Sequence, residues 1–274
     1  MSFGTTSFFQ KANDLSCRSL ACRLTRLIRA QARNLCGYGL LLSDEPRVVR
    51  AWARGWDAEH FIRLLRWRDS GFAPKVVYDI GAHDGRWSEM CQFLLRPERC
   101  YLFEPQTTYQ EMAQARQPRE GAIWKFIPVA LGDRIESTVL HLTRNAAASS
   151  LLEPLAGPEA NTGGINSTGR QAVSVVALDA FVAKENIPPP DLVKIDVQGF
   201  EGRVLNGGAN VLPSANKMVI EVSLRAIYHD QPSLPSILST LCSWGFKLDD
   251  ISEAYRQWPD VRQWQVDLWL TREQ

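Results

Sequence analysis

From about residue 70 onward, short apolar runs alternate with segments of helical periodicity. The runs are apolar at nearly every position, which is typical of strands that a sheet buries on both faces. They are Lys75–Ile80, Cys100–Phe103, Trp124–Val129, Leu192–Val197 and Met218–Val222, and the helical patterns include Ala58–Asp69, Arg86–Leu95 and Thr107–Arg116. This alternation predicts an α/β domain with a doubly wound, mostly parallel sheet and helices on both faces.

Two segments depart from simple alternation. Apolar and polar residues alternate over Ser137–Leu142, which predicts a local antiparallel addition. The following Thr143–Arg170 is rich in Gly, Asn, Ser, Thr and Pro and has no clear periodicity, which is typical of a lid or of a mobile surface loop. Phe246–Ile251 and Gln265–Leu270 predict two further strands near the end of the chain.

The α/β domain is predicted to span residues 58–274, and residues 1–57 are predicted to form a helical extension outside it. Within residues 15–36, arginines recur among leucines at helical spacing, which predicts a basic amphipathic helix. Two interpretations stay open. The helix packs its leucine face on the domain or on a second copy of the chain, or it docks on an anionic surface of a membrane or of a partner.

Composition narrows the class of protein. The 31 Lys and Arg balance 30 Asp and Glu to a net charge of +1, which gives no case for a nucleic-acid partner. No apolar run is long enough to predict a transmembrane helix. The start lacks the pattern of a secretory signal, and the six cysteines lack the spacing of a metal site. We therefore expect a reduced, cytoplasmic protein without a structural metal.

The carboxyl end of the first predicted strand carries the strongest chemical signal, because ligands of open parallel sheets bind there. It reads D-I-G-A-H-D-G from Asp79 to Gly85, and Gly81 and Gly85 let the backbone turn tightly beside a ligand. Asp79 stands where a dinucleotide-binding G-x-G-x-x-G has its first glycine. That carboxylate, with Asp84 nearby, disfavours a diphosphate and suits the cationic amine of S-adenosylmethionine. The alternative is that Asp79 caps the turn and that the glycines serve packing.

Two later positions support a nucleoside ligand. Glu104 follows the second strand about twenty residues beyond Gly85, where an acidic side chain can hold a ribose diol or, alternatively, cap a helix. Lys194 and Asp196 lie in a strand that should be buried, where charges need partners. Asp196, at the carboxyl end, is predicted to face the ligand. Lys194 either faces the same crevice or forms a structural ion pair with Glu221.

Together these segments resemble the FkbM-type methyltransferases over about residues 58–272. The resemblance rests on V-Y-D-I-G-A-H-D-G, L-F-E-P, A-L-G-D, S-S-L-L, L-V-K-I-D-V-Q-G-F-E and V-I-E-V-S, which start at Val77, Leu102, Ala130, Ser149, Leu192 and Val219. It implies a class I, Rossmann-like fold with a seven-stranded sheet, its last strand antiparallel, and S-adenosylmethionine as cofactor. It also implies O-methyl transfer to a hydroxyl of a sugar, a glycan or a secondary metabolite.

The resemblance also assigns site residues. The implied cofactor-binding residues are Asp79, Gly81, Ala82 and Gly85 by the methionine part, Glu104 and Pro105 by the ribose, Ala130 and Leu131 by the adenine, and Asp196 by the reactive methyl. Where most relatives have K-I-D-V-E-G, this chain has Gln198, so a carboxylate is lost beside the site.

The transfer needs alignment of the acceptor hydroxyl and a group that takes its proton. The candidate bases are Asp196, His83 and His229, and the alternatives are that His83 is a turn residue and His229 an ordinary surface histidine. Two other functions stay open: a nicotinamide-dependent oxidoreductase, which Asp79 disfavours, and a noncatalytic binding protein that keeps the fold.

Overall fold

The computed structural model describes residues 51, 54–118, 121–155, 165–257 and 262–273. Contacts within the chain divide it into two compact units, Met1–Ala58 and Glu59–Gln274, and the second is described below. The predicted basic helix over residues 15–36 lies outside the described residues, so its proposed contacts stay predictions. In the described part of the chain, no helix combines the length and apolar character needed to cross a bilayer.

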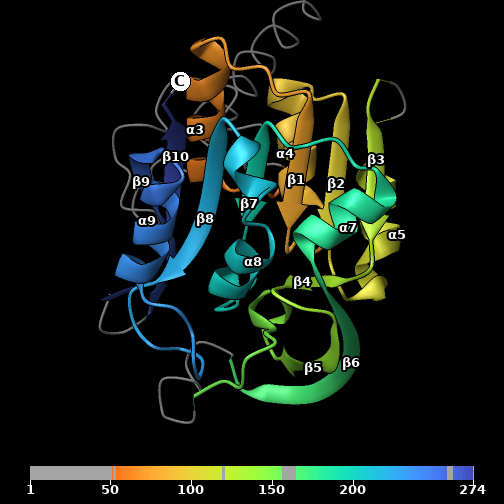
Figure 1. Cartoon of the computed structure of the whole chain (residues 1–274), viewed down its shortest axis with the longest axis vertical. Coiled ribbons are helices and arrows are strands. Elements are labelled where there is room, and N and C mark those ends of the chain that lie inside the picture. Colours follow the sequence, from red (N-terminus) through yellow and green to blue (C-terminus); the bar gives the residue numbers. More distant parts are fainter. Residues whose placement is uncertain (1–50, 52–53, 119–120, 156–164, 258–261, 274) are drawn as a thin grey trace, which may run out of the picture. The chain divides into compact units, whose positions relative to one another are not determined.

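A seven-stranded sheet forms the centre of the domain (Figure 1). Its strands lie in the order β3-β2-β1-β7-β8-β10-β9. Their bounds are β1 Val76–Ile80, β2 Arg99–Phe103, β3 Ile123–Ile127, β7 Leu192–Ile195, β8 Lys217–Ser223, β9 Phe246–Gln257 and β10 Arg262–Arg272. The first five run parallel to their neighbours, whereas β10 is antiparallel to both β8 and β9. This arrangement confirms the predicted class I, Rossmann-like fold with an antiparallel last strand.

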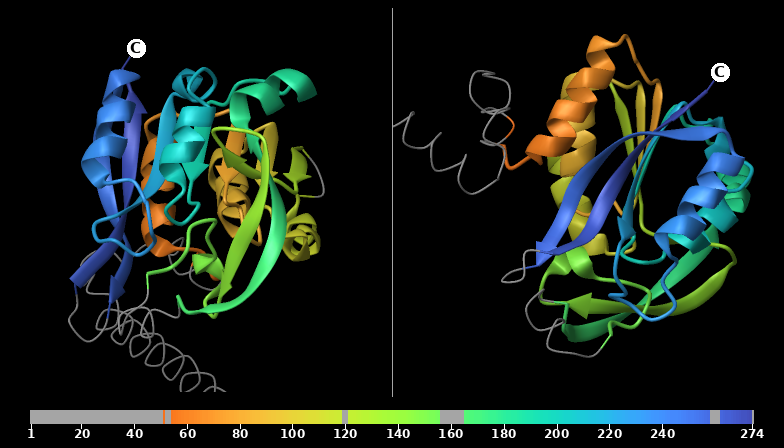
Figure 2. Two further views of the ribbon diagram at one scale, coloured as in Figure 1. Left: turned by 60° about the horizontal axis from the view of Figure 1, so that its bottom comes forward. Right: turned by 90° about the vertical axis from the view of Figure 1, so that its left-hand side faces the viewer.

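Helices cover both faces of this sheet (Figure 2). On one face lie α3 Ala58–Asp69, α4 Arg86–Leu95 and α5 Gln110–Arg116, and on the other α7 Leu178–Glu185, α8 Glu201–Gly207 and α9 Leu234–Ser243. Because both faces are covered, every residue of β1 and β7 is buried. The continuous apolar runs of the sequence reflect this burial.

A three-stranded sheet lies beyond the carboxyl ends of β1 and β7 (Figure 1). It consists of β4 Ala130–Gly132, β6 Ser167–Ala177 and β5 Glu136–Thr143, in that order. β5 pairs antiparallel with β6, which confirms the predicted addition at Ser137–Leu142. Its partner β6 begins inside the predicted loop Thr143–Arg170, so that loop ends earlier than expected. The connection between β5 and β6 contains the short helix η2 Ala146–Ala148, which lies near the carboxyl ends of the main strands.

Candidate active site

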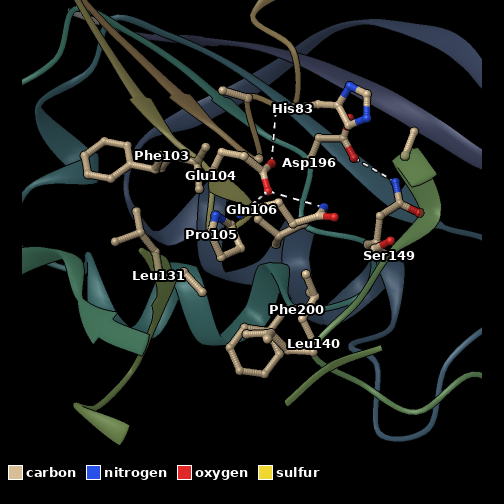
Figure 3. A pocket seen from close by; sticks show the side chains of 18 of the residues that line it. His83, Phe103, Glu104, Pro105, Gln106, Leu131, Leu140, Ser149, Asp196 and Phe200 are labelled. Atoms are coloured by element: carbon tan, nitrogen blue, oxygen red, sulfur yellow. Dashed lines mark hydrogen bonds between the residues drawn. The ribbon is translucent and has the colours of Figure 1, made fainter. Parts of the chain in front are cut away.

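A cavity of about 220 Å³ lies at the carboxyl ends of β1, β2 and β7 (Figure 3). Four groups of residues line it: the turn after β1, the end of β2, the apolar residues of the small sheet, and the segment after β7. They include Gly81, Ala82, His83, Glu104, Pro105, Ala130, Leu131, Leu140, Ser149, Lys194, Asp196 and Phe200. The cavity therefore collects seven of the nine predicted cofactor residues, all except Asp79 and Gly85.

The turn between β1 and α4 depends on two glycines. Gly81 has φ +80°, and a Cβ there would lie 1.8 Å from the carbonyl oxygen of Asp196. Gly85 has φ +79°, and its Cβ would lie 3.1 Å from that of Ala113. Other residues are strained at such φ values, and at Gly81 the backbone of the neighbouring strand end leaves no room. Both glycines are therefore required for the shape of the cavity.

Glu104 presents a buried carboxylate at the end of β2. Its Oε2 accepts the backbone N–H of His83 at 3.0 Å, and its Oε1 accepts that of Gln106 at 3.0 Å. Burial raises the pKa of Glu104, and these two donors oppose the shift. The hydrogen bonds fix the carboxylate at the cavity wall, where a remaining lone pair of each oxygen can accept from a diol.

Apolar side chains form the opposite part of the wall. Phe103, Leu131, Leu140 and Phe200 lie around one side of the cavity (Figure 3). They come from β2, β4, β5 and the residue before α8. A flat aromatic ring such as adenine fits a wall of this chemistry.

Asp79 lies behind the cavity rather than on its wall. It is fully buried, its Oδ2 accepts the hydroxyl of Ser88 at 2.7 Å, and its Oδ1 lies 3.9 Å from Nζ of Lys194. Burial raises the pKa of Asp79. Its carboxylate therefore contacts Ser88 and Lys194. Any effect of Asp79 on the amine of a ligand in the cavity is indirect and acts through these two residues.

Two arginines neutralise the second acid of the turn, Asp84. Its Oδ2 lies 2.9 Å from Nε of Arg86 and 3.1 Å from Nη2 of Arg116. Although burial opposes it, the contact with His83 and the two guanidinium groups lower the pKa of Asp84 to about 2. Because the charge of Asp84 is already paired with these arginines, Asp84 would repel a diphosphate less than the sequence suggested.

Lys194 and Asp196 form an ion pair at the end of β7, in which the side chain of Lys194 is 10% exposed and that of Asp196 is 28% exposed. Nζ of Lys194 lies 3.0 Å from Oδ2 of Asp196. The alternative pairing of Lys194 with Glu221 is wrong, since the described ion pairs of Lys194 go to Asp196 and Asp79. Burial favours the neutral form of Asp196, but the charge of Lys194 outweighs this and lowers its pKa.

Gln198 links two carboxylates. Its backbone has φ +53°, and its Nε2 donates to Oδ1 of Asp196 at 2.8 Å and to Oε2 of Glu221 at 2.9 Å. Its Oε1 accepts from the hydroxyl of Tyr228 at 3.3 Å. Gln265 also donates to Glu221. The glutamine in place of the family's glutamate therefore supplies a donor that two acids share, which the sequence alone did not reveal.

The structure separates the two candidate histidines. His83 lines the cavity, and its ring stacks on Tyr109 with centroids 3.8 Å apart. Among the described residues, no group forms a hydrogen bond to its buried Nε2. His229 is exposed on the loop after β8, and its backbone N–H donates to the carbonyl of Glu153 at 2.9 Å. It lines neither this cavity nor the one described next.

A second cavity, of about 180 Å³, adjoins the first. Ala147, Asp196 and Gln198 line both. The remaining lining residues are Asn145, Ala148, Ile165, Glu221, Ile227, Tyr228 and Gln265. Both cavities therefore meet at Asp196, beside η2. The predicted lid supplies part of each wall, and its residues 156–164 lie outside the described part of the chain.

The fold and the glycine turn are those of the class I, Rossmann-like architecture. The methyltransferase FkbM domain matches residues 79–248, and the chain belongs to this family, with S-adenosylmethionine as its cofactor. The expected family and the expected cofactor are thereby confirmed.

Two characterised relatives are similar in sequence. The hexuronic acid methyltransferase AglP of Haloferax volcanii is 26% identical over 165 residues, covering 59% of this chain and 60% of AglP. The 2-O-methyltransferase NoeI of Sinorhizobium fredii is 28% identical over 179 residues, covering 62% of this chain and 72% of NoeI. The chain thus matches less than two thirds of the length of AglP. Among solved structures, the magnesium protoporphyrin IX methyltransferase of Synechocystis PCC 6803 is 12% identical with a TM-score of 0.45, covering 91% of this chain and 94% of that one.

Proposed function

We propose that this chain transfers the methyl group of S-adenosylmethionine to a hydroxyl of a sugar or glycan. The observation that carries the proposal is the position of Asp196, which lines both the cavity with the glycine turn and the cavity beside it. The names of AglP and NoeI, a hexuronic acid methyltransferase and a 2-O-methyltransferase, support a carbohydrate acceptor and oxygen as the methylated atom.

The residues of the first cavity fit the proposed cofactor. Gly81 and Ala82 would hold the methionine part, Gly85 would support it by forming the turn into α4, and Asp79 would act from behind through Lys194. Glu104 and Pro105 would hold the ribose, while Ala130 and Leu131 would lie against the adenine. The cofactor supplies a sulfonium-bound methyl group that is already electrophilic.

Asp196 would orient the acceptor and take its proton. Lys194 and Gln198 hold the two carboxylate oxygens, each of which keeps a lone pair for a hydroxyl. The cofactor would supply the methyl group and keep the electrons of the broken S–C bond on sulfur, while Asp196 would take the hydroxyl proton and release it to water. Because the pKa of Asp196 is lowered, it is a weak base, and alignment contributes much of the acceleration. His83 faces the first cavity only, so it ranks behind Asp196 as the base.

The test is Asp196→Asn, which keeps the shape of the side chain. Purified enzyme is incubated with methyl-labelled S-adenosylmethionine and a panel of neutral, amino and acidic sugars, and cofactor affinity is measured by calorimetry. We expect turnover to fall by roughly 10²- to 10⁴-fold, with cofactor affinity little changed. His229→Ala is the control and should keep full turnover.

Two results would contradict the proposal. Full activity of Asp196→Asn would remove Asp196 from the reaction. Tight cofactor binding by the unaltered chain without methyl transfer to any sugar of the panel would favour the noncatalytic binding protein instead.

A further inference from the structure

Polar and apolar side chains together line the second cavity. Asp196, Gln198, Glu221, Gln265 and Tyr228 supply carboxylate, amide and hydroxyl groups. Ile165 and Ile227 add apolar side chains to the same lining. A sugar ring has the same mixed chemistry, with hydroxyls at its edge and C–H groups on its faces. The cavity adjoins the proposed methyl donor at Asp196, so a ring placed there can present a hydroxyl to it.

A buried donor packs against three of the residues that line this cavity. Trp264 packs in one cluster with Ile165, Ile227 and Tyr228, and is 6% exposed. Within the described residues, its Nε1–H has no hydrogen-bond partner. Buried donors of this kind are normally satisfied. A hydroxyl-rich ligand in this part of the structure would offer an acceptor that the described residues do not.

The charged groups of this cavity are acidic. Among the described residues that line it, Asp196 and Glu221 carry carboxyl groups and none is Lys, Arg or His. The nearby ammonium of Lys194 lines the first cavity and is already 3.0 Å from Asp196. Glu221 accepts from the amides of Gln198 and Gln265 and has no ion pair among the described contacts. Burial, with Asp196 and Asp267 nearby, raises the pKa of Glu221 well above its usual range.

We propose that the second cavity is the acceptor subsite and that it selects sugars that are neutral or carry an amine, and rejects sugars that carry a carboxylate. This proposal rests on the proposed methyl transfer and adds the class of acceptor. A carboxylate buried here would lose its water and lie against the ionised Asp196, with no Lys, Arg or His among the described lining residues to offset the repulsion. An ammonium would instead be attracted by Asp196, and its charge would favour release of the proton that the raised pKa keeps on Glu221. The chain would then differ in acceptor from AglP, whose name specifies a hexuronic acid.

The test uses three methyl glycosides of glucose that differ only at C6: the hydroxymethyl form, the aminomethyl form and the carboxylate. Binding to the full chain saturated with S-adenosylhomocysteine is followed by saturation-transfer NMR. We expect the neutral and amine forms to bind and the carboxylate to bind about tenfold more weakly or less. With S-adenosylmethionine in place of the product, mass spectrometry then detects methylated sugar.

Two variants connect the selectivity to this cavity. Asn145 is exposed at the rim, so Asn145→Lys adds an ammonium without disturbing the core, and it should reduce the discrimination against the carboxylate to about threefold or less. Asn145→Gln is its neutral control. Glu221→Gln should weaken the amine form more than the neutral form, while Glu111→Gln, the same change at an exposed position on α5, should alter neither.

The possible results distinguish the selectivity, the assignment of the cavity and the proposed function from one another. Binding of the carboxylate as tightly as the neutral form would overturn the selectivity, as would discrimination that Asn145→Lys leaves unchanged. Binding of none of the three sugars by a chain that binds S-adenosylhomocysteine would overturn the assignment of the cavity. Failure of the proposed function has a different signature, namely bound sugar and bound cofactor without methyl transfer.

Discussion

The substitution Gln198→Glu tests the hydrogen-bonding centre of the site. Gln198 is 8% exposed, and its Nε2 lies 2.8 Å from Asp196 Oδ1 and 2.9 Å from Glu221 Oε2. The glutamate would bring a third carboxyl group against these two. Two ionised groups about 3 Å apart repel by roughly 5 kcal/mol at an effective dielectric constant near 20. The variant is therefore expected to bind a proton in the folded state rather than to hold three charges.

The expected loss of stability depends on pH. At about pH 8, Gln198→Glu loses two hydrogen bonds, and its folded state must also take up a proton. Together these effects should lower the free energy of unfolding by about 3 kcal/mol or more. The introduced carboxyl has a raised pKa in the folded state, so above its unfolded pKa the folded state binds more protons than the unfolded state. Stability then falls as the pH rises. At about pH 5 the loss should be smaller, roughly 1 kcal/mol.

Urea unfolding followed by circular dichroism at both pH values measures these losses against the unaltered chain. Gln114→Glu, the same change at an exposed position of α5, is the control and should be within about 0.5 kcal/mol of it. An equal loss at the two pH values would show a steric effect instead, and no loss at either would refute the contact between the three groups.

Four further results are expected. Gly81→Ala should cost about 3 kcal/mol or more in urea unfolding because its Cβ would meet the backbone of β7, whereas Gly71→Ala, at φ +87° with no atom within 4 Å, should cost only about 1 kcal/mol; equal losses would contradict the steric argument. Glu104→Ala should weaken S-adenosylmethionine binding by about 1–3 kcal/mol in calorimetry, and unchanged affinity would remove it from the ribose site. Burial raises the pKa of Glu201 to about 7, so the unaltered chain should lose up to roughly 3 kcal/mol of stability as the pH rises from its unfolded pKa to that value, and Glu201→Gln should flatten this part of the stability profile. Deletion of residues 1–50 should leave a domain with a cooperative thermal transition, and molten protein would show that the extension belongs to the core.

The main sheet was predictable because its strands are buried on both faces and therefore read as continuous apolar runs. β6 was not, since Ser167–Ala177 begins with small and polar residues, and most of its first half is exposed or half-buried. Its pairing with β5 comes from the hairpin and not from a local signal.

The ion pair of Lys194 was partly accessible from the sequence. Residues two apart on a strand point to the same face, which already favours Asp196 over Glu221 as its partner. The contact with Asp79 depends on register, since Asp79 pairs with Lys194 across β1 and β7. Register between strands more than a hundred residues apart cannot be read from spacing. The bridge of Gln198 depends in addition on a positive φ.

The small sheet gives the chain a separate means of changing its acceptor. A Cβ on Gly207 of α8 would lie 1.7 Å from the carbonyl oxygen of Gly132, so the sheet is fixed to the domain at β4 through contact between backbones. The β5–β6 connection, by contrast, reaches the site through Asn145 and the short η2 segment. Substitutions and insertions in that connection can reshape the second cavity, our proposed acceptor subsite, while the glycine turn and Glu104 stay untouched. Exchange of this hairpin between relatives is therefore a direct route to changing the acceptor without altering the proposed cofactor site.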